Sequence, residues 1–157
     1  MFHKHQGRTG SPGPRSKREF GSAFVEFALI FPILTLMAIG VGDFGRAFYA
    51  GIVITNAANA GVEYGSRNQS SSTDTTGMAN AAKNDAQGLT GVTATAQRYC
   101  QCSNGNAVSC TTSGTCLTGS KRTYVSVTTG YTFNTLIRYP RIPSSITMSR
   151  QAVMRAK

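Results

Sequence analysis

The feature that most constrains this chain is an apolar run of twenty residues, 23–42, near its N-terminus. Its only ionisable side chain is Glu26, and the remaining residues are apolar or small apart from Thr35. An α-helix rises about 1.5 Å per residue, so the run spans about 30 Å, the thickness of a bilayer core. We therefore expect a transmembrane helix over residues 22–42, with room in the 157-residue chain for one further small domain.

The carboxylate of Glu26 is the unusual group in this run. A charged side chain deep in a bilayer costs about 2–3 kcal/mol on insertion scales, so it needs a partner. The basic residues Lys17 and Arg18 precede Gly21, and Glu26 lies four residues after Ser22. If the chain is cut after Gly21, the new α-amino group of Ser22 lies on the helix face of Glu26. The pattern thus predicts cleavage at Gly21, where the missing side chain favours an unwound, accessible backbone.

These residues resemble the processing site of prepilins, and more closely the TadE-like pseudopilins of tight-adherence (Tad) pili. The resemblance covers roughly residues 17–65 and rests on Gly21, Ser22, Glu26, Phe27, Pro32 and the segment Asp43-Phe44-Gly45-Arg46-Ala47-Phe48-Tyr49. It implies that an aspartic prepilin peptidase removes a basic leader, residues 1–21, on the cytoplasmic side. It also implies that Glu26 and Phe27 align subunits, and that helix packing involves Pro32, Asp43, Phe44, Arg46 and Phe48.

The function that the resemblance implies is structural. The chain would be a minor pseudopilin, a membrane-anchored subunit that takes part in assembling a Tad-type pilus for adhesion. Its partners would be the bacterial inner membrane, the prepilin peptidase, other pilin or pseudopilin subunits and the assembly platform. Two alternatives stay open: a pilus-tip subunit that binds a surface or DNA through its cysteine loop, and a secreted protein whose residues 1–50 form a signal peptide. The long basic leader and Glu26 speak against the last of these.

The distribution of charge predicts the topology. The chain has 16 Lys and Arg against 6 Asp and Glu, a net charge of +10. Five of these cations precede the apolar run against Glu19 alone, a net +4, so a chain starting at Ser22 carries +6. Residues 43–62 contain only one cation, Arg46, so the positive-inside rule places the N-terminus in the cytoplasm and the C-terminal domain in the periplasm. Residues 121–122 and 138–141 are basic and hold a tyrosine, which suits nucleic acid, but no nucleic-acid partner is expected.

All four cysteines, Cys100, Cys102, Cys110 and Cys116, lie on the outer side of the predicted membrane span. An even number within seventeen residues indicates a disulfide-stapled loop, since the spacing lacks the paired C-x-x-C pattern of zinc sites. Cys100 and Cys102 are too close in sequence to favour pairing with each other. Each should pair with Cys110 or Cys116, and the sequence leaves the choice open.

Beyond residue 42 the periodicity predicts an α+β fold: a long helix packed on a small antiparallel sheet, as in pilins. The helix should run from Ser22 to about Ser66, with bends at Pro32 and at the glycines near 40–45. Residues 43–66 form its extramembrane part, with an apolar stripe at Phe44, Phe48, Ile52, Ala57, Ala58, Gly61 and Val62. The small residues of 56–61 should allow a close approach to a sheet or another helix.

Residues 67–157 should form the periplasmic or extracellular domain. We expect a polar loop over 67–75, a short helix over 76–87, and strands over 92–96, 125–133 and 146–153, with the cysteine loop joining the first two strands. Asp43 and Arg46 lie three residues apart just outside the membrane span. They can be a solvated interface pair, a subunit-packing element as the resemblance implies, or both, since the two interpretations are not exclusive.

The sequence favours neither catalysis nor a cofactor. Both histidines, His3 and His5, lie in the leader, and the acids of the outer domain, Glu63, Asp74 and Asp85, lack paired spacing. A Gly-rich phosphate loop and a nucleophile elbow are also missing from the sequence. We expect a protein that is not an enzyme and holds no metal.

Overall fold

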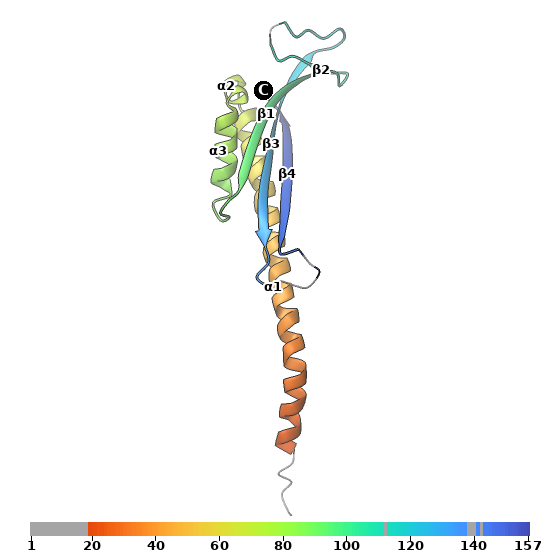
Figure 1. Ribbon diagram of the computed structural model, residues 1–157. Helices are drawn as coiled ribbons and strands as arrows, with labels where there is room; N and C mark the ends of the chain where they lie inside the picture. Colours follow the sequence, from red (N-terminus) through yellow and green to blue (C-terminus); the bar gives the residue numbers. More distant parts are fainter. Residues whose placement is uncertain (1–18, 112, 138–140, 142) are drawn as a thin grey trace, which may run out of the picture. The chain divides into compact units, whose positions relative to one another are not determined.

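A computed structural model describes residues 19–157 except residues 112, 138–140 and 142. The chain divides into two compact units, residues 1–39 and 40–157. Its elements in chain order are α1 (Glu19–Ser66), α2 (Gln69–Thr73), α3 (Thr75–Asp85), β1 (Thr93–Cys102), β2 (Ala107–Val108), β3 (Lys121–Asn134) and β4 (Ser145–Arg155) (Figure 1). The long N-terminal helix, the antiparallel sheet and two disulfides confirm the predicted fold class.

Helix α1 contains 48 residues and ends at Ser66, as predicted, but it begins at Glu19 rather than near Ser22. In the first unit the side chains of residues 21–38 are all exposed, including large apolar ones such as Phe24 and Leu29. The helix is long and apolar enough to cross a membrane, since its most apolar stretch has a mean hydropathy of 2.3. None of this stretch is buried. The first unit therefore presents an apolar surface, which no described residue of the chain buries.

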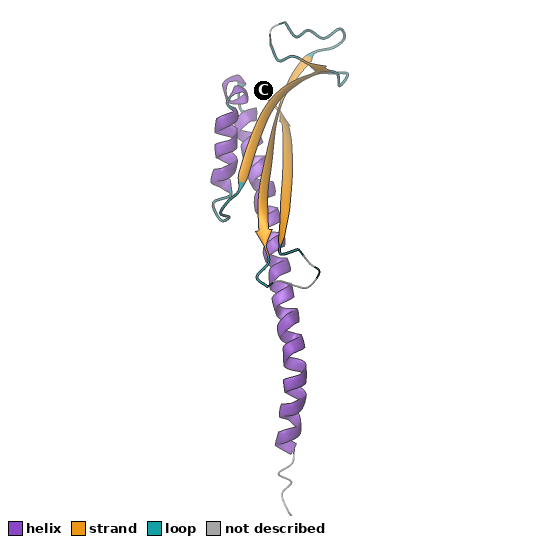
Figure 2. Ribbon diagram, in the orientation of Figure 1, coloured by secondary structure: helices purple, strands orange, loops and turns teal. Residues whose placement is uncertain are grey.

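The second unit is a four-stranded antiparallel sheet in the order β2-β1-β3-β4 (Figure 2). Strand β3 lies in the middle and pairs with β1 over ten residues and with β4 over eleven. Side chains alternate between the two faces of a strand, so Val125, Val127 and Thr129 share one face of β3, and all three are buried. Helix α3 packs against β1 on this face. The C-terminal half of α1 packs there against β3, where the Thr129 hydroxyl donates to the Ile54 carbonyl at 2.7 Å.

The core of the second unit joins α1, α3 and β3. It consists of Val62, Met78, Ala82, Val125 and Val127. A Cβ atom at Gly61 would lie 2.9 Å from the Met78 carbonyl oxygen and 3.0 Å from Val127, so the glycine permits the close approach of α1 to both neighbours. Ala57 and Ala58 are buried as well. The close approach expected for the small residues of 56–61 is therefore confirmed.

The predicted polar loop over 67–75 is wrong in part, because it contains α2. The Asn68 side chain caps this helix by accepting the Ser71 N–H at 2.8 Å. Asp74 caps α3 in the same way, by accepting the Gly77 N–H at 2.8 Å. Such caps satisfy backbone donors at a helix start. Helix α2 is built from Gln, Ser and Thr alone, so it has no apolar period that could reveal it.

The three predicted strands are confirmed, but each is longer than its sequence pattern. Strand β1 extends to Cys102, so Cys100 and Cys102 belong to the sheet and not to the loop. The two-residue strand β2 was not predicted, and it pairs with the end of β1. The added residues of β1 and β4 pair with β3. This pairing satisfies their backbone hydrogen bonds, although no apolar alternation in the sequence marks these residues as strand.

Candidate functional site

The residues of the predicted cleavage site lie at the start of α1. Gly21 and Ser22 are helical and exposed, and a Cβ atom at Gly21 would meet open space. The Ser22 hydroxyl donates to the Glu26 carboxylate at 3.4 Å, so the two share a helix face as their spacing predicted. The unwound backbone expected at Gly21 is not found. N–H groups of a first helical turn have no intrahelical acceptor, however, which leaves this stretch of backbone open to a partner.

Residues 1–18 of the predicted leader lie outside the described residues, and with them the basic residues before Glu19. The start of the leader, including His3 and His5, therefore stays a prediction.

The apolar segment after Glu26 satisfies its one hydroxyl locally. Thr35 donates to the Phe31 carbonyl at 2.8 Å, one turn back along α1. Phe27 and Phe31 lie one turn apart with ring centroids 5.4 Å from each other. Pro32 lies inside α1 and has no N–H, so the carbonyl one turn before it has no helical donor. Phe27 and Pro32 are exposed, as are all residues from 21 to 38. They are therefore accessible to another subunit, and their role in subunit contacts stays a prediction.

Asp43 is a buried carboxylate at the start of the second unit, with 6% of its surface exposed. Its Oδ1 and Oδ2 atoms accept the backbone N–H of Leu136 at 3.2 and 3.0 Å. Arg46 donates to Oδ1 at 2.9 Å, and its guanidinium lies 5.3 Å from the centre of the Phe133 ring. These contacts fasten α1 to the segment that follows β3. The predicted pair of Asp43 and Arg46 is therefore present, but only its Arg46 side is solvated, with 49% of that side chain exposed, while Asp43 is buried and bonded to a residue 93 positions later in the chain. A role of the pair in subunit packing stays a prediction.

Phe44 and Phe48 lie on a different face of α1 from Asp43. They are 74% and 65% exposed, and Ile52 is 46% exposed. The predicted stripe from Phe44 to Val62 is therefore wrong in its first half. The residues of α1 that are buried against the sheet and α3 are Asp43, Ala50, Ile54, Ala57, Ala58, Gly61, Val62 and Gly65.

Two shallow grooves of about 340 and 300 Å³ lie between α1 and β4. Both are lined by Ala47; Phe44 and Ile146 line the first, and Phe48 and Met148 the second. Most of this lining is apolar. The part of α1 next to the first unit thus combines an apolar exposed face with apolar grooves, which is the surface chemistry of a protein contact.

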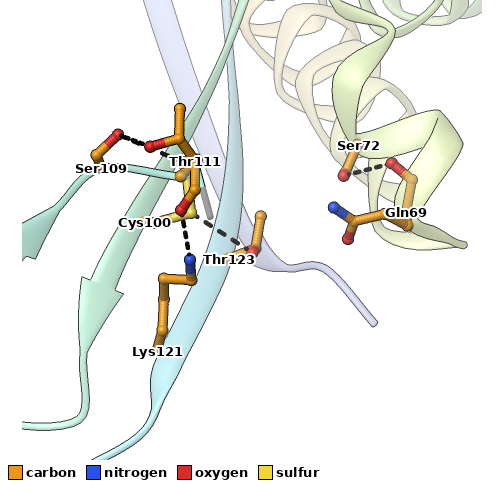
Figure 3. Close-up of a disulfide and its surroundings, with 8 residues drawn as sticks. Gln69, Ser72, Cys100, Ser109, Thr111, Lys121 and Thr123 are labelled. Atoms are coloured by element: carbon orange, nitrogen blue, oxygen red, sulfur yellow. Dashed lines mark hydrogen bonds between the residues drawn. A yellow bond between two sulfur atoms is a disulfide. The ribbon is translucent and has the colours of Figure 1, made fainter. Parts of the chain in front are cut away.

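The cysteines form two disulfides, Cys100–Cys110 and Cys102–Cys116, with Cα–Cα distances of 5.2 and 5.7 Å. The prediction that each strand cysteine pairs with one of the later two is confirmed. Strand β1 positions the first pair of cysteines, whose side chains share one face because they are two residues apart. Figure 3 shows Cys100 next to Thr123 of β3 and the Lys121 ammonium on the Thr111 carbonyl, at 2.8 Å. The loop is thus tied to β1 by two disulfides and to β3 by the hydrogen bond from Lys121.

Tyr64 connects α1 to the cap of α3. Its hydroxyl donates to Asp74 Oδ2 at 3.0 Å, while the other oxygen of Asp74 accepts the Gly77 N–H. The hydrogen bond to the Asp74 carboxylate, and then its negative charge, raise the pKa of Tyr64 above its ordinary value of 10.0, and Arg67 opposes this rise. This pair was not predicted, since a tyrosine and an acid ten residues apart carry no pattern of their own.

The described part of the chain offers binding surfaces rather than reactive groups. Among the described residues no cluster of three or more His, Cys, Asp or Glu side chains could hold a metal ion. The four cysteines are all in disulfides, and Asp43 and Asp74 are engaged as acceptors of structural hydrogen bonds. These residues form an apolar helix, an exposed apolar face of α1 around Phe44 and Phe48, and a loop held by two disulfides.

The comparison with protein families gives one match: residues 21–63 match the family model described as TadE-like protein. The resemblance seen in the sequence is thereby confirmed, and the match begins at Gly21 itself. It associates the chain with Tad pili and with an N-terminal membrane helix, and it ends before α2. No curated protein and no solved structure matches the chain.

Proposed function

We propose that this protein is a minor pseudopilin that a prepilin peptidase cleaves between Gly21 and Ser22, and that takes part in assembling a Tad-type pilus for adhesion. The observation that carries the proposal is where the family match begins relative to the predicted cleavage site. The TadE-like match starts at Gly21, and immediately after it Ser22 and Glu26 share one helix face. The family is one of pilus structure and assembly, which supports a structural role.

Cleavage resolves the electrostatic problem of Glu26. In the uncut chain the one polar contact described for its carboxylate is the Ser22 hydroxyl at 3.4 Å. Cleavage creates an ammonium at the backbone nitrogen of Ser22, on the same helix face. An opposite charge one helical turn from the carboxylate offsets part of the cost of a charged side chain in a bilayer, which is about 2–3 kcal/mol. The carboxylate of one subunit can also pair with the ammonium of the next, which would align subunits.

The anchor of the proposed subunit is residues 22–42 in the bacterial inner membrane. The five cations before the span hold the N-terminus in the cytoplasm, and residues 67–157 then fold in the periplasm. That compartment is oxidising, which agrees with the two disulfides of the second unit.

The lateral face of α1 supports a role in assembly. Phe44 and Phe48 are exposed, and the grooves beside them are lined by Ile146 and Met148 of β4. Exposed apolar surface of this kind gains stability when a second subunit covers it, at about 25 cal/mol per Å². We assign this face to contacts with neighbouring pilins or with the assembly platform.

The test is the mature N-terminus, measured by mass spectrometry in cells with and without the prepilin peptidase. The proposal predicts a chain that starts at Ser22 only when the peptidase is present. Gly21→Leu should block cleavage, whereas Gly21→Ala, the smallest change, should reduce it less. A mature chain that starts near residue 50, or one whose start is independent of the peptidase, would contradict the proposal and favour a secreted protein.

A further inference from the structure

The charges of this protein are segregated along the chain. All six acids, Glu19, Glu26, Asp43, Glu63, Asp74 and Asp85, lie in residues 19–85. Residues 86–157, which form the sheet and its loops, contain eight Lys and Arg and no Asp or Glu. The sheet half is therefore cationic throughout, and no acid of its own sequence can neutralise it. Such a field attracts polyanions.

The strand register gathers part of this charge beside the aromatic side chains on the sheet face that points away from α1 and α3. Tyr99 of β1 pairs with Tyr124 of β3, which pairs with Arg155 of β4. Two residues further along β1, Gln101 pairs with Arg122 of β3. These five residues alternate with the buried ones, so their side chains share the outer face, where directly paired residues have Cβ atoms about 4.5–5.5 Å apart. We call them the outer cluster.

The outer cluster combines an aromatic stack with two arginines, of which Arg155 is exposed and Arg122 is half-buried, with its Nε buried and without a hydrogen-bond partner. The rings of Tyr99 and Tyr124 are stacked, with centroids 5.6 Å apart and an interplanar angle of 17°. Neither Arg122 nor Arg155 forms an ion pair within the part of the chain that the structure describes. The outer face further along the strands holds Thr95, Gln97, Thr128, Ser149 and Gln151, together with the apolar Val153 next to Arg155 and the buried Ser126. The cluster is thus a pair of arginines beside an aromatic stack, bordered by hydroxyl and amide groups and by Val153.

We propose that the outer cluster binds an acidic polysaccharide, that is, a linear chain of sugars that carry carboxylates. Arg122 and Arg155 would hold carboxylates through their planar, bidentate forks. Tyr99 and Tyr124 would offer an apolar surface with polar tips to a sugar ring, and Gln101 an amide to its hydroxyls.

The neutral groups around the outer cluster favour this partner over other polyanions. Gln97, Gln101 and Gln151 lie on the same face as the two arginines, together with threonine and serine hydroxyls, so neutral donors and acceptors outnumber the cations there. A polysaccharide presents hydroxyls between its carboxylates and suits such a face. A nucleic acid presents closely spaced phosphates, which call for a denser array of cations.

Binding is measured with the full-length chain in nanodiscs of neutral phosphatidylcholine, by biolayer interferometry at physiological salt. The probes are polygalacturonate, neutral dextran, single-stranded DNA and vesicles that contain phosphatidylglycerol. We expect binding of polygalacturonate and none of dextran. Arg122→Gln with Arg155→Gln should weaken it by about tenfold or more, because two charge-assisted contacts are lost. Arg122→Lys with Arg155→Lys keeps the charge but not the fork and should lie between.

The matched control is Arg67→Gln with Lys83→Gln, which removes the same charge from the helical half of the second unit. Near-wild-type binding by this control supports the proposal; an equal loss in both double variants shows a mere net-charge effect and overturns it. So does absent binding of polygalacturonate by the wild-type chain, or tighter binding of DNA or vesicles. Should the glutamine variant unfold, the lysine variant decides. The uncut chain carries the same cluster, so this test and that of the mature N-terminus fail independently.

Discussion

Glu26 and Asp43 are two carboxylates on one helix that differ in where their partners come from. Asp43 accepts two hydrogen bonds from the Leu136 N–H and one from Arg46, all within the second unit. Glu26 is exposed, and the hydrogen bond described for it comes from the Ser22 hydroxyl at 3.4 Å. A buried charge is tolerated when it is paired and hydrogen-bonded, and Asp43 meets that condition inside the folded chain. In a membrane, Glu26 would meet this condition only with a positive charge such as the ammonium that cleavage creates at Ser22, or that of a neighbouring subunit.

The two regions around these acids differ in the same way. In the second unit the chain buries apolar side chains of its own, such as Ile54 and Val62, although Phe44 and Phe48 near Asp43 are exposed. Around Glu26 every side chain from residue 21 to 38 is exposed. The second unit therefore buries a core of its own, whereas the apolar side chains of residues 21–38 are exposed. Substitutions in the two regions should affect different measurements.

The largest expected effect is that of Glu26→Ala on assembly. We expect pili to be lost while cleavage after Gly21 largely persists, because the variant keeps the cut bond but not the carboxylate that pairs with the new ammonium. Pili are counted by electron microscopy, and cleavage is followed by mass spectrometry. Glu26→Asp, which keeps the charge on a shorter side chain, is the matched control. Normal pili in the Glu26→Ala strain would remove the proposed role of this acid.

A smaller and different effect is expected of Asp43→Ala. It leaves the Leu136 N–H and the Arg46 guanidinium without their acceptor, and should lower the free energy of unfolding of the second unit by about 2–3 kcal/mol. Denaturant unfolding of the full-length chain in detergent measures this. Glu26→Ala should leave the same unfolding curve unchanged. If Asp43→Ala is as stable as wild type, the contacts of Asp43 do not fasten α1 to the segment after β3.

The smallest effect concerns Tyr64, whose pKa is raised by the hydrogen bond to Asp74 and its charge. A group whose folded pKa lies above its unfolded value stabilises the fold below the unfolded pKa, here 10.0, and loses this contribution as pH rises through the folded pKa. Wild type should therefore lose stability above pH 10 by more than Tyr64→Phe, which cannot ionise. Thermal unfolding from pH 8 to 11 makes the comparison. Parallel pH profiles for the two proteins would show that the pair does not contribute.

Local patterns carried the predictions that succeeded. The spacing of Ser22 and Glu26, the length of the apolar run, the alternation in β3 and the even number of cysteines each depend on neighbours within a few residues or on composition. The long-range features were missed. Nothing near Asp43 in the sequence points to Leu136, and nothing near Tyr99 points to Tyr124 or Arg155. Residues 138–140 of the basic segment 138–141 lie outside the described residues, so the predicted basic surface there stays a prediction.

The sequence by itself determined the apolar run of residues 23–42 with its single acid, and the three long strands of the sheet. These follow from hydropathy, helical rise and the two-residue period of a strand. Only the tertiary structure decided which face of α1 is buried, which cysteines pair, and which side chains meet on the outer sheet face. The physical reason is strand register: a shift of one residue would turn Tyr124 to the helix side and Val125 to the outside. That register is set by the whole core acting together, so no short stretch of sequence contains it.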